Sequence, residues 1–590
     1  MRSLRFLTAS ALLALAPGLI LAQATSEAEK IDRLFEAWFE ANLEQNPVFA
    51  TFVGDNRYND RFPVEIAPEE RAKTEALDRE YLKQIDAIDT QRLDSQRLLS
   101  HQIFKSQRER ALEGLRFPSH LLPLNQFSST PNSFAQLGSG SGIHPFKTVK
   151  DYDDWLKRVD GLVAWVDQAV VNMREGVAKG YVQPRILMEK VLPQLMAQVV
   201  AKPEDSLFWG PVKNFPAGFT DADKARLTPA FASAITTKLV PAYKKLHDFV
   251  EAEYLPKCRE TVGLAALPDG AAWYAYNVRR ITTTDLTPQQ IHQIGLDEVA
   301  RIHAEMDRVM KEVAFTGDRG AFFSFVKNDP RFYWTTREEL IQGYYEIKKR
   351  ADGALPKLFE TLPKADYEIR AVEPFREKSA SGGQYQAASP DGTRPGIFYA
   401  NAYDLKSRPK WAMESLSLHE GNPGHHFQGM VARENESLPR FRRFGGFTAY
   451  SEGWGLYAES LGKELGMYAD PYQYFGMLDA ELWRAIRLVV DTGLHAQGWT
   501  RQQVLDYMGR NSASGEATKV SEAERFMAIP GQALAYKLGQ LKIRELRTRA
   551  EQKLGAKFDV RKFHSEILRD GALPLDVLDK KIERWLAQAH

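Results

Sequence analysis

The sequence has a single cysteine, no surplus of charge of either sign, and no long apolar run after its first two dozen residues. The one cysteine, Cys258, excludes an internal disulfide and therefore a small disulfide-stapled scaffold. Lys and Arg number 78 against 77 Asp and Glu, which argues against a general nucleic-acid binder, because such proteins need clustered excess cations. The 590 residues are 44% hydrophobic and 26% charged, as expected for a large globular protein.

The first 24 residues have the pattern of an export signal. Arg2 and Arg5 precede an apolar run over residues 6–22, and Ala22-Gln23-Ala24 places small residues where a signal peptidase reads them. We expect cleavage after Ala24 and a periplasmic or secreted mature chain of residues 25–590. An uncleaved anchor is the alternative, but the run is short, and no later stretch approaches the roughly 20 apolar residues of a membrane span. We therefore expect no membrane anchor after cleavage.

Helix signals dominate the mature chain. Thr287-Pro288-Gln289-Gln290 reads as a capping box with proline at the first helical position, and Thr336 and Thr500 repeat this start signal with Glu339 and Gln503. Strand-like runs are few. The pattern predicts a mainly α fold: a large helical protein with a substrate cleft between its halves and a small β-sheet.

No linker cleanly divides the mature chain, so we predict one helical unit, loosely divided into residues 25–280 and residues 281–590. Two Gly-, Ser- and Pro-rich stretches, Ser129–Gly142 and Lys378–Gly396, are predicted as loops. The second loop leads into a strand candidate, Ile397–Asn401, and then into a helix that starts near Pro409.

Chemistry-bearing residues concentrate in one window, which contains His419, Glu420, His425 and His426. A hydrolytic zinc site needs two imidazoles, a carboxylate and an open position, with a second carboxylate to accept a proton from water. The alternative is a polar loop with ordinary hydrogen-bonded histidines. Three histidines within eight positions favour the metal site.

The spacing of these histidines does not fit a regular helix. His425 would point about 120° away from His419, and His426 would share its face about 10 Å further along the axis. Pro423 removes a helical hydrogen bond and Gly424 tolerates unusual dihedrals, so we predict a local bulge that brings the second histidine back.

A third metal ligand is predicted on a later helix. Glu452 and Glu459 are seven residues apart and share one helix face, with Gly453 and Gly455 permitting close approach of another helix. Glu452 is the ligand candidate, although an ordinary solvated glutamate is the simpler alternative. Glu459 is the candidate to hydrogen bond a ligand histidine.

These motifs resemble those of the bacterial domain-of-unknown-function family 885. The resemblance extends over nearly the whole mature chain and rests on four runs: His419-Glu420-x-x-Pro423-Gly424-His425-His426, Ser451-Glu452-Gly453-Trp454, Trp483-Arg484 with residues 487–495, and residues 530–537. That family is in turn similar to the gluzincin metallopeptidases, which include the thimet-type oligopeptidases, the angiotensin-converting-enzyme type and the Taq-type carboxypeptidases. Those enzymes are mostly helical with a deep cleft.

The resemblance implies one zinc ion per chain. Aligning Gly424-His425 with the Gly-His pair of the gluzincin signature makes His419, His425 and Glu452 the metal ligands, with His426 as an alternative second ligand. Glu420 would be the general base. Gluzincins commonly place an acidic residue four positions after the ligand glutamate, but Leu456 stands there, so support for the ligands is expected from Glu459 or Asp491.

The resemblance also suggests residues that contact the substrate. His495 and Tyr536 are candidates to stabilise the oxyanion, although a buried tyrosine bonded to backbone is an equal alternative for Tyr536. The strand candidate with Tyr399 and Asn401 would pair as an edge strand with a peptide backbone.

Two arginines are candidates for the end of the substrate. Arg484 and Arg487 lie three apart on a predicted helix and would hold a C-terminal carboxylate through bidentate contacts. The more common alternative is that they pair with internal acids, here Glu481 or Asp491.

The sequence is thus interpreted as an exported zinc metallopeptidase that hydrolyses short peptides, either an oligopeptidase or a carboxypeptidase. Two alternatives remain. A non-catalytic, metal-containing peptide-binding protein is conceivable because the inserted Pro423-Gly424 alters the motif, although a structural site needs no free Glu420. A zinc amidohydrolase acting on a non-peptide amide would use the same residues. The oligomeric state is not indicated.

Overall fold

The computed structural model describes residues 26–372, 377, 381–388 and 395–588. About 70% of the chain is helical, with one three-stranded sheet in the described part, so the predicted mainly α class is confirmed. The predicted signal sequence lies outside the described residues. No helix among the described ones is both long enough and apolar enough to cross a membrane.

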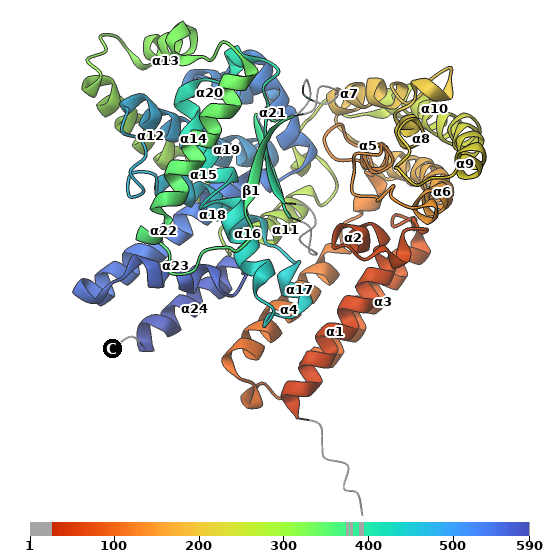
Figure 1. Cartoon of the computed structure of the whole chain (residues 1–590), viewed down its shortest axis with the longest axis horizontal. Coiled ribbons are helices and arrows are strands. Elements are labelled where there is room, and N and C mark those ends of the chain that lie inside the picture. Colours follow the sequence, from red (N-terminus) through yellow and green to blue (C-terminus); the bar gives the residue numbers. More distant parts are fainter. Residues whose placement is uncertain (1–25, 373–376, 378–380, 389–394, 589–590) are drawn as a thin grey trace, which may run out of the picture.

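The elements fall into three groups along the chain (Figure 1). The first group is α1 (Glu27–Gln45), α2 (Pro47–Phe52), α3 (Pro68–Asp86) and α4 (Ser95–Gly114). The second is α5 (Thr130–Leu137), α6 (Val149–Lys179), α7 (Arg185–Met196), α8 (Gly210–Lys213), α9 (Asp221–Ala234) and α10 (Val240–Phe249). The third begins with α11 (Gly270–Thr282), α12 (Pro288–Glu312), α13 (Arg319–Asn328) and α14 (Arg337–Ala354), followed by the sheet of β1 (Tyr367–Ala371), β2 (Gly383–Gln386) and β3 (Gly396–Ala400). It ends with α15 (Met413–Glu420), α16 (His425–Glu434), α17 (Arg440–Arg443), α18 (Thr448–Ser460), α19 (Pro471–Ala496), α20 (Arg501–Asn511), α21 (Glu516–Ala528), α22 (Ala535–Leu554), α23 (Val560–Leu568) and α24 (Leu575–Gln588).

The predicted helix starts are confirmed. Thr287, Thr336 and Thr500 each form a complete capping box at the first turn of α12, α14 and α20. The predicted loop Ser129–Gly142 is wrong in part, because α5 occupies most of it and begins with Pro131 in its first turn. The predicted loop Lys378–Gly396 contains β2, and its residues 378–380 and 389–394 lie outside the described part.

Two hydrophobic cores divide the chain differently from the predicted halves. A smaller core lies largely within residues 124–258, around Trp155 and Trp165. The larger core joins the first helices to the last third of the chain: Phe35 of α1 and Phe104 of α4 both pack on Phe441 of α17, with ring centroids 4.7 and 5.4 Å away. Burial of aromatic surface therefore ties α1 and α4 to the later helices.

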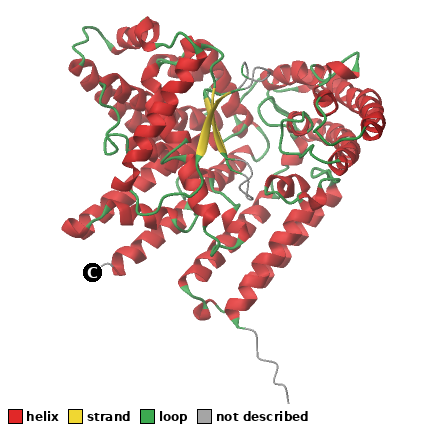
Figure 2. Cartoon of the chain, viewed as in Figure 1, coloured by secondary structure: helices red, strands yellow, loops and turns green. Residues whose placement is uncertain are grey.

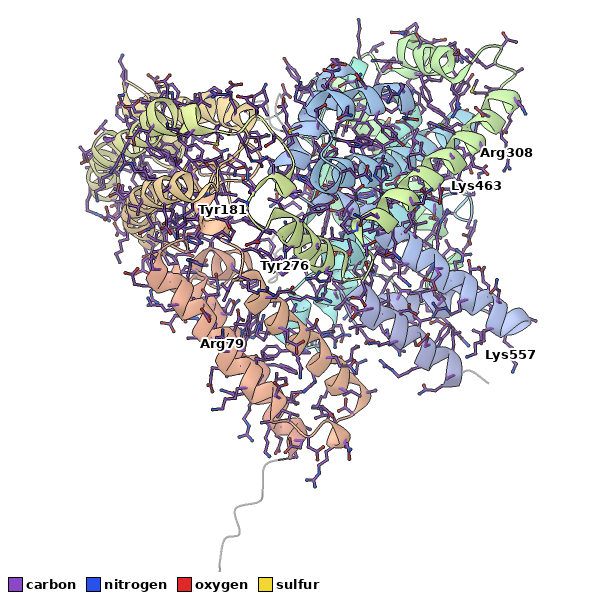
Figure 3. The ribbon with its side chains drawn as sticks, turned by 180° about the vertical axis from the view of Figure 1, so that it is seen from behind. Arg79, Tyr181, Tyr276, Arg308, Lys463 and Lys557 are labelled. Atoms are coloured by element: carbon purple, nitrogen blue, oxygen red, sulfur yellow. The ribbon has the colours of Figure 1, made fainter. Side chains whose placement is uncertain are left out.

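The boundary predicted near residue 280 falls inside α11, which packs against α18, α19 and α22. Figure 3 shows Tyr276 of α11 from behind. Its hydroxyl donates a hydrogen bond to the carbonyl of Arg110 in α4 at 2.9 Å. α11 thus contacts both α4, one of the first helices, and the later helices α18, α19 and α22.

Glycine contacts set the closest helix crossings in the larger core. A β-carbon on Gly453 of α18 would overlap the backbone of Gly539 in α22, so only glycine at both positions permits this approach. Gly295 of α12 has the same relation to Val489 of α19, where a β-carbon would lie 2.8 Å from a side-chain methyl. The predicted close approach at Gly453 is confirmed. It sets the position of α18, and with it that of Glu452, relative to α22.

The sheet has the order β1-β3-β2, with β1 parallel and β2 antiparallel to β3. β3 is buried along its whole length, and neighbouring strands cover both of its edges. The prediction that this strand adds a peptide at its edge is therefore wrong. The edge strands are β1 and β2 of this sheet, whose strands are yellow in Figure 2.

The two substrate residues predicted on this strand lie elsewhere than expected. Tyr399 is 8% exposed and its backbone pairs with Arg370 and Gln384 on the two neighbouring strands. Asn401 is 1% exposed, and its amide donates to the carbonyl of Glu377 at 2.7 Å. Both residues hold the sheet together, so neither backbone edge is open to a peptide.

Candidate metal centre

The two histidines of the motif lie on two separate helices. α15 ends at Glu420, residues 421–424 form a turn, and α16 begins at His425. Gly424 is required in this turn because a β-carbon there would overlap the carbonyl oxygen of His419. The indole of Trp454 on α18 donates to the carbonyl of Pro423 at 2.7 Å and holds the turn in place. The predicted bulge is thus a complete helix break.

The break brings three predicted ligands together. Nε2 of His419 and Nε2 of His425 lie 3.6 and 3.5 Å from the same carboxylate oxygen of Glu452, and one ligand atom from each residue lies within 4.8 Å of the others. The two imidazole rings are 4.6 Å apart at 84°. Bonds of about 2.0–2.1 Å to a tetrahedral zinc give ligand-to-ligand distances of about 3.3–3.4 Å. The observed distances fit this donor set.

The centre is buried on one side and open on the other. The side chain of His419 is 4% exposed, whereas those of His425 and Glu452 are 20% and 21% exposed. Burial alone would lower the pKa of His419, but the carboxylates of Glu452 and Glu459 outweigh it and raise that pKa to about 10. Burial opposes ionisation of Glu452 as well, yet hydrogen bonds from both histidines hold its pKa well below the usual range. The charges of this cluster are therefore arranged to hold a cation.

Glu459 fixes the orientation of the first ligand. Its Oε1 lies 2.7 Å from Nδ1 of His419, and its other oxygen accepts a hydrogen bond from the hydroxyl of Ser415. Because Nδ1–H donates to Glu459, the lone pair of Nε2 faces Glu452 and His425 when the ring is neutral. Glu452 and Glu459, two turns apart on α18, thus contact opposite nitrogens of one imidazole.

We expect Glu459→Gln to weaken metal binding by about 10- to 100-fold, because an amide supports the Nδ1–H of His419 less well than a carboxylate. Competition with a chelator of known affinity measures the metal Kd. Glu464→Gln is the matched control: Glu464 follows α18, is 39% exposed and pairs with Arg547. Equal affinities for Glu459→Gln and the native chain would contradict the assigned role.

Asp491 does not share this role. Its carboxylate accepts hydrogen bonds from the hydroxyl of Tyr274 at 2.6 Å and from the backbone N–H of Gly531 at 3.1 and 3.2 Å. Burial raises its pKa to about 7, although both hydrogen bonds act in the opposite direction. These contacts tie α19 to α11 and to the segment before α22, so its prediction as a support for the metal ligands is corrected.

Glu420 lies beside the three ligands and at the free edge of the sheet. Its Oε2 accepts a hydrogen bond from the backbone N–H of Tyr385 in β2 at 3.0 Å, and the residue is 9% exposed. Since β3 occupies the other edge of β2, this N–H points away from the sheet. The carboxylate of Glu420 therefore occupies the edge of β2, where the backbone of an added strand would lie.

His426, the alternative second ligand, is excluded by its contacts. Its Nδ1 lies 2.8 Å from the hydroxyl of Tyr385, its Nε2 lies 3.0 Å from the carbonyl oxygen of Ala365, and it is fully buried. Both ring nitrogens are occupied away from Glu452. Burial lowers its pKa, so the neutral form is favoured.

His495 is excluded as an oxyanion donor on similar grounds. Its Nδ1 accepts a hydrogen bond from the N–H of Leu264, so Nε2 carries the proton and donates it to the carbonyl of Phe526, both at 2.9 Å. Burial lowers its pKa to about 4, which keeps the ring neutral. Tyr536, the other candidate, is 9% exposed, and its hydroxyl lies 3.4 Å from an Arg525 nitrogen.

The two arginines predicted to hold a carboxylate differ in their partners. Arg487 donates to Glu522 at 2.6 Å, an internal acid that is neither of the two expected ones. Glu481 pairs instead with Arg301 and Lys537. Arg484 lies 3.9 Å from Glu459 and makes a backbone hydrogen bond to its own helix.

Several residues around the centre were not predicted from the sequence. Tyr385 and β2 fell inside the predicted loop, because a four-residue strand carries little periodic signal. Ser415 lies one turn before His419 on α15, a spacing that could have identified it. Gly455 was expected to permit close approach of another helix, and α15 does approach there; that the group it meets is the His419 ring, 2.8 Å from the point where a β-carbon would lie, was not predicted.

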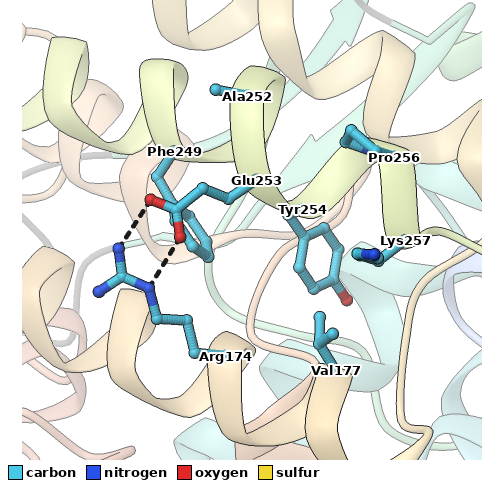
Figure 4. A pocket seen from close by; sticks show the side chains of 8 residues that line it. All are labelled: Arg174, Val177, Phe249, Ala252, Glu253, Tyr254, Pro256 and Lys257. Atoms are coloured by element: carbon cyan, nitrogen blue, oxygen red, sulfur yellow. Dashed lines mark hydrogen bonds and ion pairs between the residues drawn. The ribbon is translucent and has the colours of Figure 1, made fainter.

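Three surface hollows lie apart from this centre and are lined by none of its ligands. One hollow of about 360 Å³ lies between α6 and the segment after α10, with Arg174, Phe249 and Glu253 in its wall (Figure 4). Arg174 and Glu253 form a bidentate ion pair at 2.8 and 2.9 Å, which leaves no unpaired charge on either. This hollow has no chemistry comparable with the metal centre.

Comparisons with known proteins agree with the architecture. A chain described as a "putative lipoprotein" from Colwellia psychrerythraea is 30% identical, with a TM-score of 0.89 over 95% of this chain and 99% of that one. A "putative lipoprotein of unknown function" from Shewanella oneidensis is 17% identical, with a TM-score of 0.72 over 94% and 99% of the two chains, and so shares the fold. A "putative oligoendopeptidase F" from Bacillus anthracis str. Ames is 13% identical over 88% and 96% of the two chains, with a TM-score of 0.28, too low to indicate a common fold.

No curated protein matches the sequence. A family model does match: residues 47–582 fit the model described as bacterial protein of unknown function, DUF885. The match covers the helix break, the three clustered ligands and the helices that support them. The chain therefore belongs to the bacterial protein family DUF885.

Proposed function

We propose that this protein is a zinc-dependent peptidase that hydrolyses short peptides. The observation that carries the proposal is the approach of two imidazole nitrogens to one carboxylate oxygen at 3.5 and 3.6 Å, with Glu420 adjacent and one side open. Two histidines and one carboxylate are the protein ligands of many hydrolytic zinc sites, which keep a fourth position free. A closed structural site needs four protein ligands and no neighbouring base.

Each residue has a defined task in this proposal. His419, His425 and Glu452 hold the zinc ion, which when bound polarises the peptide carbonyl and acidifies water. Glu420 takes the proton from the attacking water and returns it to the leaving amine. Tyr536 donates a hydrogen bond to the carbonyl oxygen as negative charge develops on it.

The edge strand supports a peptide as the substrate. The N–H of Tyr385 at the edge of β2 donates to Glu420, so an extended peptide that pairs with β2 takes the place of this carboxylate on the N–H and passes beside it. Such backbone pairing holds a peptide through groups that every peptide carries. Side-chain specificity then comes from other surfaces.

Export is part of the proposal. The charged and apolar pattern of residues 1–24 is that of a secretory signal. Two relatives of the same fold are described as lipoproteins, a class of exported proteins. Cys258 is buried and lies far from the predicted cleavage site, so a lipid anchor on it is not part of the proposal.

Metal removal tests the proposed function. The purified mature protein is analysed for metal content and for cleavage of a mixed library of short peptides, then stripped with a chelator and reloaded with zinc. We expect one zinc per chain, loss of cleavage on stripping and recovery on reloading. Bound metal without cleavage of any peptide would favour a peptide-binding protein or hydrolysis of a non-peptide amide.

A further inference from the structure

Arg484 differs from Arg487 and Arg525 because none of the described carboxylates lies within hydrogen-bond distance of it. Its Nη1 donates to the carbonyl of Ala480 at 3.1 Å, and none of the described residues accepts a hydrogen bond from its Nη2. The nearest carboxylate oxygen to Nη2 belongs to Glu459, at 3.9 Å. The side chain is 18% exposed, so it is accessible from outside.

The two neighbouring arginines each form an ion pair with an acid, although Nε and Nη1 of Arg487 and Nε of Arg525 have no hydrogen-bond partner among the described residues. Arg487 and Arg525 both donate to Glu522, at 2.6 and 3.1 Å, and Arg525 also donates to Gln532 at 2.9 Å. Their guanidinium groups pack around Tyr536, with that of Arg487 4.8 Å from the ring centre and that of Arg484 5.9 Å from it. Three cations therefore surround one tyrosine, and Glu522 engages only two of them.

The ion pair between Arg484 and Glu459 is long, and that carboxylate is shared with other groups. Both of its oxygens are engaged, one by His419 and the other by Ser415. At 3.9 Å the contact with Arg484 is too long for a hydrogen bond. A guanidinium that keeps free donors in a partly buried, cationic wall binds a planar anion such as a carboxylate through paired N–H groups.

Arg484 lies close to the candidate metal ligand His419. Nη2 of Arg484 and Nδ1 of His419 contact the same Glu459 oxygen, so the guanidinium and the ligand imidazole are separated by one carboxylate. Each extended residue spans about 3.3–3.6 Å. Because these two contacts are 3.9 and 2.7 Å long, Nη2 lies within about 7 Å of Nδ1 of His419, a distance that about two extended residues span.

We propose that Arg484 binds the C-terminal carboxylate of the substrate, so that the protein removes one or two residues from free C-termini. This inference rests on the proposed peptidase function for the cleavage step only. Recognition of the carboxylate itself requires no cleavage, so binding alone tests it.

Paired peptides of one sequence, with a free C-terminal carboxylate or a C-terminal amide, test the inference. Binding of each is measured by calorimetry to zinc-loaded Glu420→Gln protein, and cleavage by the native protein is followed by product mass. We expect the free acid to bind about 10- to 100-fold more tightly than the amide, the range for loss of a charged hydrogen bond. Products shortened by one or two C-terminal residues are expected from the acid.

The variants that separate the role of Arg484 are Arg484→Gln and Arg484→Lys in the same Glu420→Gln background. Gln should remove the preference for the acid, and Lys should restore part of it, because it keeps the charge without the planar fork. Arg501→Gln is the matched control, since Arg501 pairs with Glu524 at 2.9 Å and contacts no metal ligand in the described part. It should keep the full preference.

The outcomes distinguish this inference from the proposed function. Equal binding of acid and amide, or a preference that survives in Arg484→Gln, overturns the inference even if peptides are cleaved. Internal cleavage of amides at the same rate as acids also overturns it. A preference for acids that is lost in Arg484→Gln supports it, even if no peptide is cleaved and the peptidase proposal fails.

Discussion

Replacing Glu420 by Gln is expected to slow peptide hydrolysis by about 10²- to 10⁴-fold while the metal stays bound, the range for losing a general base. The amide has the shape of the carboxylate but cannot accept a proton from water. Glu420 is not among the three clustered ligand residues, and its Oε2 is held by the N–H of Tyr385. Measuring kcat together with zinc content per chain separates loss of the base from loss of the metal.

The control for this variant is Glu436→Gln, in the exposed segment after α16. It makes the same change of charge and should leave both kcat and zinc content unaltered. Unchanged hydrolysis in Glu420→Gln would show that another group takes the proton. Loss of zinc in Glu420→Gln would instead make Glu420 part of the metal shell.

Local signals allowed the three clustered candidate ligands to be predicted from the sequence. His419 and His425 lie in one short window, and Glu452 and Glu459 share a helix face at a spacing of two turns. Helix starts such as Thr287 depend on residues three positions apart, and these were also predicted. Such features are encoded in a few consecutive residues, so they can be read without tertiary information.

The conformation between the two histidines could not be predicted in the same way. Pro423 and Gly424 indicate that a regular helix fails, but a bulge and a full break are both compatible with them. The choice is made by distant groups, namely the indole of Trp454, which binds the turn, and Asp352, which accepts from the Asn422 amide at 2.8 Å.

Candidates chosen by residue type and position were the least reliable. The ring nitrogens of His495 are occupied by the backbone of Leu264 and Phe526, which are 231 and 31 residues away in sequence. Tyr399 lies on a buried central strand because β2, a four-residue segment, covers the edge that was expected to be free. No pattern within either segment reports such long-range pairing.

Which segments share a hydrophobic core could not be predicted either, because this also depends on long-range packing. Composition gave no sign that Phe35 and Phe104 pack on Phe441, about 400 and 340 residues later, as the ring distances show. The smaller core around Trp155 is formed mostly by residues 124–258. Segment boundaries therefore depend on which apolar faces meet, and an apolar face does not specify its partner.

Replacing Gly455 by Ala is expected to raise the metal Kd by about 10- to 100-fold, because the new methyl group would displace a ligand ring. A β-carbon at this position would lie 2.8 Å from Cε1, 3.0 Å from Nε2 and 3.1 Å from Nδ1 of His419. The ring cannot shift freely, since Glu459 holds its Nδ1 at 2.7 Å. Any displacement of the ring therefore moves Nε2 away from the position in which it can bind the same metal ion as His425 and Glu452.

Intrinsic helix propensity predicts the opposite effect on the helix itself, which makes the result diagnostic. Gly→Ala within a helix stabilises it by about 1 kcal/mol when nothing obstructs the methyl group. Gly429 of α16, the helix that carries His425, has no atom within 4 Å of the point where a β-carbon would lie, so Gly429→Ala should raise stability and leave metal binding unchanged. Chelator competition gives the metal Kd, and urea unfolding of the metal-free proteins gives the free energy of unfolding. Normal zinc affinity in Gly455→Ala would show that the His419 ring does not need this position to bind metal.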